Sequence, residues 1–220
     1  MSASTKVLVL DVDDTLYLER DYVRSGFKAV EQELAKTQNA IGFGEACWQL
    51  FLSGVRDEIF NRALEGERAD QKLVDLLVAA YREHNPDISL SDETRQILDS
   101  WYSQIPIVIL TGGLASVQQK KIDALGLMQY TSTIIYAGSR GVDFDKPNLY
   151  GFERVEESTG FSGPEILYVA DNPTKDFPAV ATLNWSSYRI LLAGSLYGST
   201  PTPCGIREVR SLHDVELTPL

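Results

Sequence analysis

Three carboxylates stand within four residues near the start of the chain, at Asp11, Asp13 and Asp14, directly after the apolar run 7–10. A short run rich in Val and Leu is typical of a strand buried on both faces. Because side chains alternate along a strand, Asp11 and Asp13 point the same way. Paired acids repel each other unless a cation lies between them or one holds a proton. The spacing therefore favours a site for cation binding or proton transfer, and the alternative is a solvated acidic turn.

Three more sets of polar residues are expected at strand ends. They are Thr111-Gly112-Gly113 after the run 105–110, Lys146-Pro147 ten residues beyond the strand that ends at Tyr136, and Asp171 with Asp176 after the run 165–170. In open α/β sheets, ligands bind at the carboxyl ends of the strands. We therefore expect these side chains to converge there, with a loop that brings Lys146 back to the edge.

The four sets together contain the groups that phosphoryl transfer to a carboxylate requires. Asp carboxylates serve as nucleophiles, and Mg²⁺ prefers carboxylates with water and substrate phosphate. A lysine and hydrogen-bond donors stabilise the equatorial phosphoryl oxygens. A second acid protonates the leaving oxygen and later activates water.

The stretch Asp11-Val12-Asp13-Asp14-Thr15-Leu16 resembles the first motif of the haloacid dehalogenase-like hydrolase superfamily, whose members are mostly Mg²⁺-dependent phosphatases. The other sets match its second, third and fourth motifs in order. The resemblance implies that Asp11 is the nucleophile that becomes an aspartyl-phosphate, Asp13 the general acid/base, and Thr111, Gly112 and Lys146 the phosphate-binding residues. It also implies a metal site of Asp11, Asp13 through its backbone carbonyl, Asp171 and, in a supporting position, Asp176.

The acid at Asp13 bears on the reaction type that the resemblance implies. In the dehalogenase branch, the position two residues after the nucleophile is not an acid, because a halide leaves without a proton. An alcohol leaving from phosphate benefits from one. The resemblance therefore implies hydrolysis of a small phosphomonoester, such as a sugar phosphate or a nucleoside monophosphate. A phosphomutase, which uses the same pair, and a non-catalytic phospho-switch similar to bacterial receiver domains stay open.

Two positions depart from the superfamily's pattern. Gly112 stands where the second motif often has Asn, and Asn172 stands where many members have a second Asp in the fourth motif. Lys175 is an alternative phosphate cation to Lys146. We favour Lys146, because Pro147 fixes the chain just after it, whereas Lys175 could face solvent.

The order of strand-like and helical patterns predicts an α/β protein with a Rossmann-like parallel sheet and helices on both faces. After the first strand the apolar residues recur at helical spacing, including one stripe from Trp48 to Ile59. We expect a catalytic core of 1–16 and 101–220. Residues 17–100 are expected to form a helical domain, which resembles the superfamily's cap inserted after the first motif.

The 220 residues carry a net charge of −11, which argues against nucleic acid and anionic membranes as partners. Two cysteines in unrelated contexts, no signal-peptide pattern and no long apolar stretch indicate a cytoplasmic protein. The expected ligands are Mg²⁺ and a small phosphorylated metabolite, and the expected state is a monomer or homodimer. Lys120 and Lys121 are expected on a solvated helix face, and the tail from Gly194 to Leu220 is expected to pack loosely.

Overall fold

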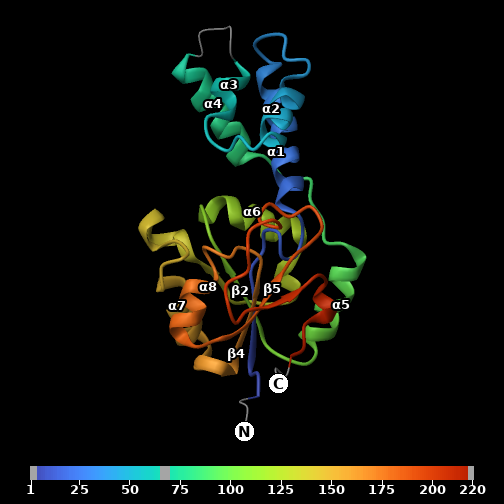
Figure 1. The fold of residues 1–220 in the computed structure, drawn as a ribbon. Coiled ribbons are helices and arrows are strands. Elements are labelled where there is room, and N and C mark those ends of the chain that lie inside the picture. The colour runs from blue at the N-terminus through green and yellow to red at the C-terminus, as the bar shows by residue number, and fades with distance from the viewer. Residues whose placement is uncertain (1–3, 65–69, 218–220) are drawn as a thin grey trace. The chain divides into compact units, whose positions relative to one another are not determined.

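The computed structural model describes residues 4–64 and 70–217. Within them, six parallel strands form one sheet in the order β3-β2-β1-β4-β5-β6 (Figure 1). The strands are β1 (Val7–Leu10), β2 (Ile107–Thr111), β3 (Ile134–Tyr136), β4 (Ile166–Ala170), β5 (Ser186–Ile190) and β6 (Arg207–Val209). The predicted α/β fold with a Rossmann-like parallel core is confirmed.

The three central strands, β1, β2 and β4, are buried along their whole length, as their unbroken apolar runs predict. The register pairs Leu10 with Ile109 of β2 and with Val169 of β4. Because the strands run in the same direction, the residues that follow them leave the sheet at one edge. Asp11 and Asp171 are therefore neighbours, although 160 residues separate them in the sequence.

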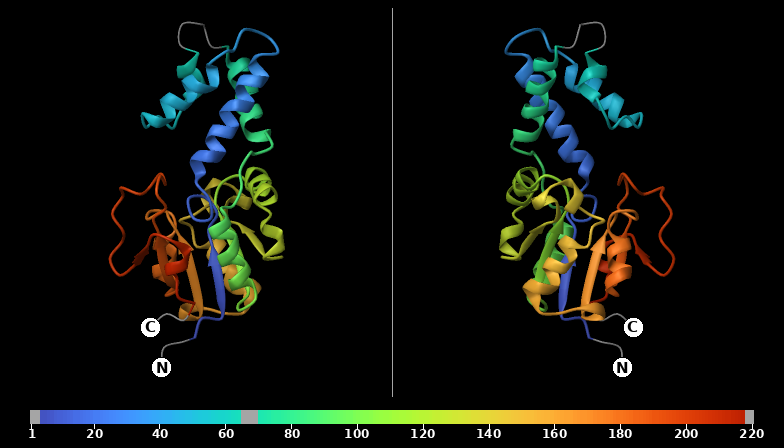
Figure 2. Two further views of the ribbon diagram at one scale, coloured as in Figure 1. Left: turned by 90° about the vertical axis from the view of Figure 1, so that its right-hand side faces the viewer. Right: turned by 90° about the vertical axis from the view of Figure 1, so that its left-hand side faces the viewer.

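Helices cover both faces of this sheet. On one face, α7 (Tyr150–Thr159) and α8 (Phe177–Leu183) pack against the strands, and Phe152 lies in the buried cluster between them. On the opposite side lies α5 (Asp92–Tyr102), and α6 (Ala115–Leu125) connects β2 to β3 (Figure 1). The strands run side by side through the middle of this part of the protein, as Figure 2 shows.

Residues 20–88 form a second compact unit. Its aromatic core centres on Phe27, whose ring contacts the rings of Phe51, Phe60 and Tyr81. Its helices are α1 (Glu19–Leu34, whose first residue belongs to the larger unit), α2 (Phe43–Leu52), α3 (Ile59–Ala63) and α4 (Gln71–Glu83).

The predicted single helical stripe from Trp48 to Ile59 is wrong. The helix α2 ends at Leu52, and Gly54 takes a φ of +94° that favours glycine. The new helix α3 then begins at Ile59. The sequence signal for this break is Ser53-Gly54, which interrupts the apolar spacing.

The larger unit consists of residues 1–19 and 89–220. The sequence predicted a core of 1–16 and 101–220. The structure instead places α5 in the larger unit and not in the helical insertion. Leu98 and Trp101 are buried there, and Ser211 donates a hydrogen bond to Glu93 at 2.7 Å. The role of the smaller unit as a cap stays a prediction. Within the described residues, no helix is long and apolar enough to cross a membrane.

The C-terminal segment is more ordered than its composition suggests. The strand β6 joins the sheet beside β5, and the buried guanidinium of Arg189 holds the preceding loop. It donates hydrogen bonds to the backbone carbonyls of Tyr197 and Thr200 and to the hydroxyl of Thr202, each at 2.7 Å. The expectation of loose packing is therefore wrong for this loop.

Candidate functional site

A buried lysine lies among acids at the carboxyl edge of the sheet. The Nζ atom of Lys146 lies 2.6 Å from Oδ1 of Asp11 and 2.8 Å from Oδ1 of Asp176. It also donates to the hydroxyl of Tyr168 at 2.9 Å, and that hydroxyl in turn donates to Asp176. Burial would lower the pKa of Lys146, but the nearby Asp11 and Asp176 raise it well above its usual value. The lysine is therefore a fixed positive charge.

The loop after β3 carries Lys146 back to the strand ends, as the sequence analysis requires. The competing candidate, Lys175, is exposed. The geometry therefore places Lys146, and not Lys175, beside Asp11.

Three buried carboxylates share this one lysine. Oxygen atoms of Asp11, Asp171 and Asp176 all lie within 4.8 Å of one another. Burial raises the pKa of Asp11 to about 7. The positive charge of Lys146 lowers this pKa, whereas the negative charges of Asp176 and Asp13 raise it further. Burial, together with Asp11 and Asp176, raises the pKa of Asp171 to about 9. When all three acids are ionised, the cluster therefore carries more negative charge than the lysine balances.

An orphaned oxygen marks where the balancing charge belongs. The Oδ2 atom of Asp171 is buried and has no hydrogen-bond partner among the described residues. By contrast, the carboxylate of Asp176 accepts from Lys146, Tyr168 and the backbone N–H of Asn172. Converging carboxylate oxygens with an unused acceptor fit a hard divalent cation. Among the described residues, this is the cluster whose donor set fits a metal ion.

A tight turn after β1 carries the second predicted acid. The backbone N–H of Leu16 donates to the carbonyl of Val12, and Asp14 takes a left-handed φ of +51°. The buried Asp14 carboxylate stabilises the turn by accepting from the backbone N–H groups of Glu19 and Leu196. This turn brings the hydroxyl of Tyr17 back to Asp13 at 2.5 Å.

Asp13 lies within a cage of donors. The Nζ atom of Lys121 lies 2.7 and 2.8 Å from its two oxygens, and Gln118 donates to Oδ2 at 3.0 Å. Burial would raise the pKa of Asp13, but Lys121 and the hydrogen bonds from Lys121, Tyr17 and Gln118 hold it below its usual value. Burial and the charge of Asp13 raise the pKa of the nearby Glu19 carboxyl to about 7. Asp13 is therefore ionised in this structure.

The expectation that Lys121 lies on a solvated helix face is wrong. Its side chain is only 3% exposed and pairs with Asp13, 108 residues away. A signal for this was available, because Lys121 precedes Ile122 and stands four residues before Leu125 on the predicted helix. These neighbours are buried, so the lysine lies on the inward side of the helix.

The second predicted motif lies against the same cage. The buried hydroxyl of Thr111 donates to the side-chain oxygen of Gln118 at 2.9 Å. A Cβ atom on Gly112 would lie 2.8 Å from Oδ1 of Asp145, so the carboxylate of Asp145 fills the space that a side chain at 112 would need. The other oxygen of Asp145 accepts from the N–H of Gly113 at 2.9 Å. These contacts give a reason for Gly at 112, where the superfamily often has Asn.

Sequence reasoning also missed supporting residues around the site. Arg189 donates from Nε to the backbone carbonyl of Asp171 at 2.8 Å. Tyr168 points from the buried strand β4 to Lys146 and Asp176. Arg189 and Tyr168 read as ordinary strand residues, and only the placement of the strands relative to one another reveals their partners.

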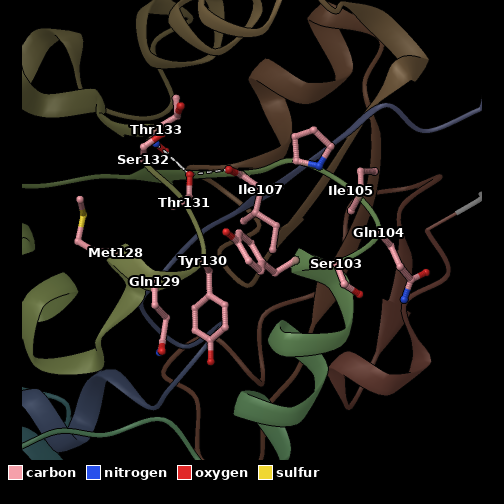
Figure 3. A pocket seen from close by; sticks show the side chains of 12 residues that line it. Ser103, Gln104, Ile105, Ile107, Met128, Gln129, Tyr130, Thr131, Ser132 and Thr133 are labelled. Atoms are coloured by element: carbon pink, nitrogen blue, oxygen red, sulfur yellow. Dashed lines mark hydrogen bonds between the residues drawn. The ribbon is translucent and has the colours of Figure 1, made fainter.

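A cavity of about 730 Å³ lies elsewhere in the larger unit (Figure 3). It opens beside Ile107, where β2 begins, and so at the end of that strand remote from Thr111. No charged residue lines it. The hydroxyl of Thr131 donates to the carbonyl of Ile107 and accepts from the N–H of Thr133, as the dashed lines in Figure 3 show. Its chemistry does not resemble that of the acidic cluster.

Two curated relatives that the sequence resembles are phosphatases. The glyceraldehyde 3-phosphate phosphatase of Methanocaldococcus jannaschii is 23% identical over 199 residues, which cover 84% of this chain and 85% of that protein. The phosphoserine phosphatase of Thermus thermophilus is 25% identical over 207 residues, which cover 78% of this chain and 82% of that protein.

A solved structure shares the fold. The HAD-hydrolase YfnB from Bacillus subtilis, solved bound to magnesium, superposes with a TM-score of 0.69 at 21% identity, covering 96% of each chain. The family description that matches residues 5–184 is that of a haloacid dehalogenase-like hydrolase. With the four motifs gathered at one sheet edge and most of its length matched, the chain belongs to the haloacid dehalogenase-like hydrolase family.

Proposed function

We propose that the protein is a Mg²⁺-dependent phosphatase of a small phosphomonoester, such as a sugar phosphate or nucleoside monophosphate, and that it works through an aspartyl-phosphate on Asp11. The observation that carries the proposal is the cluster of three buried carboxylates around a single lysine, with a further acid two residues after Asp11. Such a cluster matches the charge of a phosphate ester only when a cation joins it.

In the first half-reaction, a carboxylate oxygen of Asp11 attacks phosphorus, and the bond from phosphorus to the ester oxygen breaks. The leaving alkoxide takes a proton from the Asp13 carboxyl, so that a neutral alcohol departs. The donors that stabilise the phosphoryl oxygens are the Lys146 ammonium, the Thr111 hydroxyl and the Gly112 N–H. Asp13 is a carboxylate paired with Lys121 in this structure, so it takes up one proton from solvent before this step.

In the second half-reaction, Asp13 is the base. A water molecule gives a proton to the Asp13 carboxylate as its oxygen bonds to phosphorus, and the bond from phosphorus to the Asp11 oxygen breaks. Inorganic phosphate and the original Asp11 carboxylate are the products. The lowered pKa of Asp13, which Lys121 and the hydrogen bonds from Tyr17 and Gln118 produce against the effect of burial, leaves its carboxylate free of a proton and able to accept one.

The cation is assigned to the carboxylates of Asp11 and Asp171 and the backbone carbonyl of Asp13, with Asp176 in support. The unused Oδ2 of Asp171 supports this assignment. Bound there, Mg²⁺ would keep the acids ionised and neutralise the charge of the phosphoryl group.

Three alternatives can be compared with this reaction: dehalogenation, a phosphomutase and a phospho-switch. Dehalogenation is disfavoured by Asp13, because a departing halide needs no acid, whereas a departing alcohol does. A phosphomutase would use the same residues and yield an isomer of the substrate. A phospho-switch would hold the phosphoryl group on Asp11 without turnover.

The test is a screen of about a hundred phosphorylated metabolites with Mg²⁺, with free phosphate as the readout and Asp11→Asn as the control. Phosphate release that EDTA and Asp11→Asn both abolish would support the proposal. Release of chloride from 2-chloropropionate without any phosphatase activity would replace it with dehalogenation. An isomeric product would indicate a mutase, and a long-lived phosphoprotein after treatment with acetyl phosphate would indicate the switch.

A further inference from the structure

We propose that Lys121 and Gln118 are positioning residues that fix the Asp13 carboxylate for proton transfer. This inference rests on the proposed phosphatase function and assigns a role to two residues outside the four motifs. Both stand on α6, three residues apart and therefore on one face of the helix. Both side chains are buried at the carboxyl edge of the sheet.

The contacts fix both oxygens of the Asp13 carboxylate. Oδ1 accepts from Lys121 at 2.7 Å and from Tyr17 at 2.5 Å. Oδ2 accepts from Lys121 at 2.8 Å and from Gln118 at 3.0 Å. Two of these donors come from α6 and one from the turn after β1, so the carboxylate is held between two separate segments.

The burial of Lys121 shows that this geometry is not an incidental surface contact. An exposed lysine pair is worth little, but a lysine that is 3% exposed must be paired to stay charged inside the protein. Lysine is also long and mobile, and ordering it has an entropic cost that a mere surface contact would not offset. The helix therefore holds a buried cation that is paired with Asp13.

The cage is linked to the substrate side of the site. Gln118 accepts from the hydroxyl of Thr111 through one side-chain atom and donates to Asp13 through the other. The Thr111 hydroxyl has a single proton, so it must release Gln118 when it donates to a phosphoryl oxygen. Substrate binding therefore acts on a residue that also contacts the acid/base. Because a general acid must lie within hydrogen-bond reach of the leaving oxygen, a displaced Asp13 would slow proton transfer more than binding.

The experiment compares two substrates that differ in their need for a proton. p-Nitrophenolate leaves readily without protonation, whereas the ethoxide of ethyl phosphate does not. In Lys121→Met we expect kcat/KM for ethyl phosphate to fall about 10- to 100-fold more than kcat/KM for p-nitrophenyl phosphate. The ratio of the two values does not depend on the folded fraction, so partial unfolding cannot mimic the result. Lys120→Met, which removes the adjacent lysine from the same helix, should leave the ratio within about twofold of wild type.

A double-mutant cycle tests whether Lys121 acts through Asp13. In an Asp13→Asn background, Lys121→Met should change the ratio no further. Gln118→Met provides a second route, because it removes one contact with Asp13 without removing a buried charge. It should lower kcat/KM for ethyl phosphate about threefold to tenfold more than kcat/KM for p-nitrophenyl phosphate.

The outcomes separate this inference from the proposed function. If wild type hydrolyses neither ester with Mg²⁺ and no other phosphate ester either, the phosphatase proposal fails. If wild type is active and Lys121→Met lowers both values equally, or if its effect on the ratio persists in Asp13→Asn, the positioning role is overturned while the phosphatase proposal stands. Should Lys121→Met fail to fold, an unchanged ratio in Gln118→Met overturns the role equally.

Discussion

Two buried lysines lie at the same edge of the sheet, and each is bonded to an acid of the first motif. Lys146 binds Asp11, and Lys121 binds Asp13. Around Lys146, three carboxylates share one positive charge, and the pKa of Asp171 rises to about 9. Around Lys121, the carboxylate of Asp13 accepts four hydrogen bonds, and its pKa is lowered.

The difference indicates two uses of a buried lysine. The cluster around Lys146 is short of positive charge, which suits a site that a cation and a phosphate ester complete together. The cluster around Lys121 is already satisfied, which suits the positioning of one group. A substitution in the cluster around Lys146 should therefore slow the reaction of every substrate. A substitution in the cluster around Lys121 should slow only the steps in which Asp13 transfers a proton.

The largest expected effect comes from Lys146→Met. It leaves Asp11 and Asp176 buried without their cation, so kcat/KM should fall by about 1,000-fold for every phosphate ester, whatever its leaving group. Breaking a buried ion pair also lowers the free energy of unfolding by about 3–5 kcal/mol, which thermal unfolding would detect. Lys175→Met, at an exposed position, is the charge-matched control. A loss that grew with leaving-group pKa would give Lys146 the role assigned to the Asp13 cluster.

An intermediate effect is expected from Asp13→Asn. Asparagine keeps a similar shape but cannot carry the proton, so kcat/KM for ethyl phosphate should fall by about 100- to 1,000-fold. The value for p-nitrophenyl phosphate should fall by less than about 10-fold. Steady-state kinetics on both esters would measure the difference, and equal losses would remove Asp13 from the acid role.

A smaller, metal-linked effect is expected from Asp171→Asn. This substitution removes the carboxylate whose Oδ2 atom has no hydrogen-bond partner among the described residues. The apparent Mg²⁺ affinity, measured from the Mg²⁺ dependence of activity, should weaken by about 10- to 100-fold. Asp143→Asn, at an exposed position of the same charge, should leave the affinity unchanged. An unaltered Mg²⁺ dependence in Asp171→Asn would place the cation elsewhere.

The same residue predicts a pH dependence of stability. The pKa of Asp171 rises from 3.8 to about 9 on folding, so without metal the folded protein binds a proton that the unfolded chain releases. The free energy of unfolding in EDTA should therefore fall as pH rises from about 5 to 9. Saturating Mg²⁺ should remove most of this slope, because it binds the ionised folded form. Thermal unfolding across pH measures it, and the slope should flatten in Asp171→Asn.

Much of the fold and of the acidic cluster could be predicted from the sequence. Runs such as 7–10 and 166–170 contain only hydrophobic residues, as a strand buried on both faces requires, and the polar residues that follow them locate the sheet edge. The four sets were expected to converge, and the structure brings Asp11, Lys146, Asp171 and Asp176 together. Local patterns suffice here because each segment carries its own signal.

The remaining contacts depend on long-range pairing that no local pattern encodes. Lys121 belongs to Asp13 only because α6 packs beside the turn after β1. Arg189 reaches the backbone carbonyl of Asp171 only because β5 lies next to the strand that ends before Asp171. The short strand β6 has two exposed residues of three and so gives a weak signal. Such residues can be placed only once the sheet order is known.

The most direct measurement is a search for the covalent intermediate on Asp11. Asp13→Asn enzyme is mixed with Mg²⁺ and p-nitrophenyl phosphate, quenched in acid within the first turnover, and analysed by peptide mass spectrometry. Because this variant lacks the base for the second half-reaction, a burst of p-nitrophenol equal to the enzyme concentration should accompany one phosphoryl group on Asp11. Wild-type turnover with no phosphoryl group on Asp11 in the variant, or with the group on another residue, would contradict nucleophilic attack by Asp11.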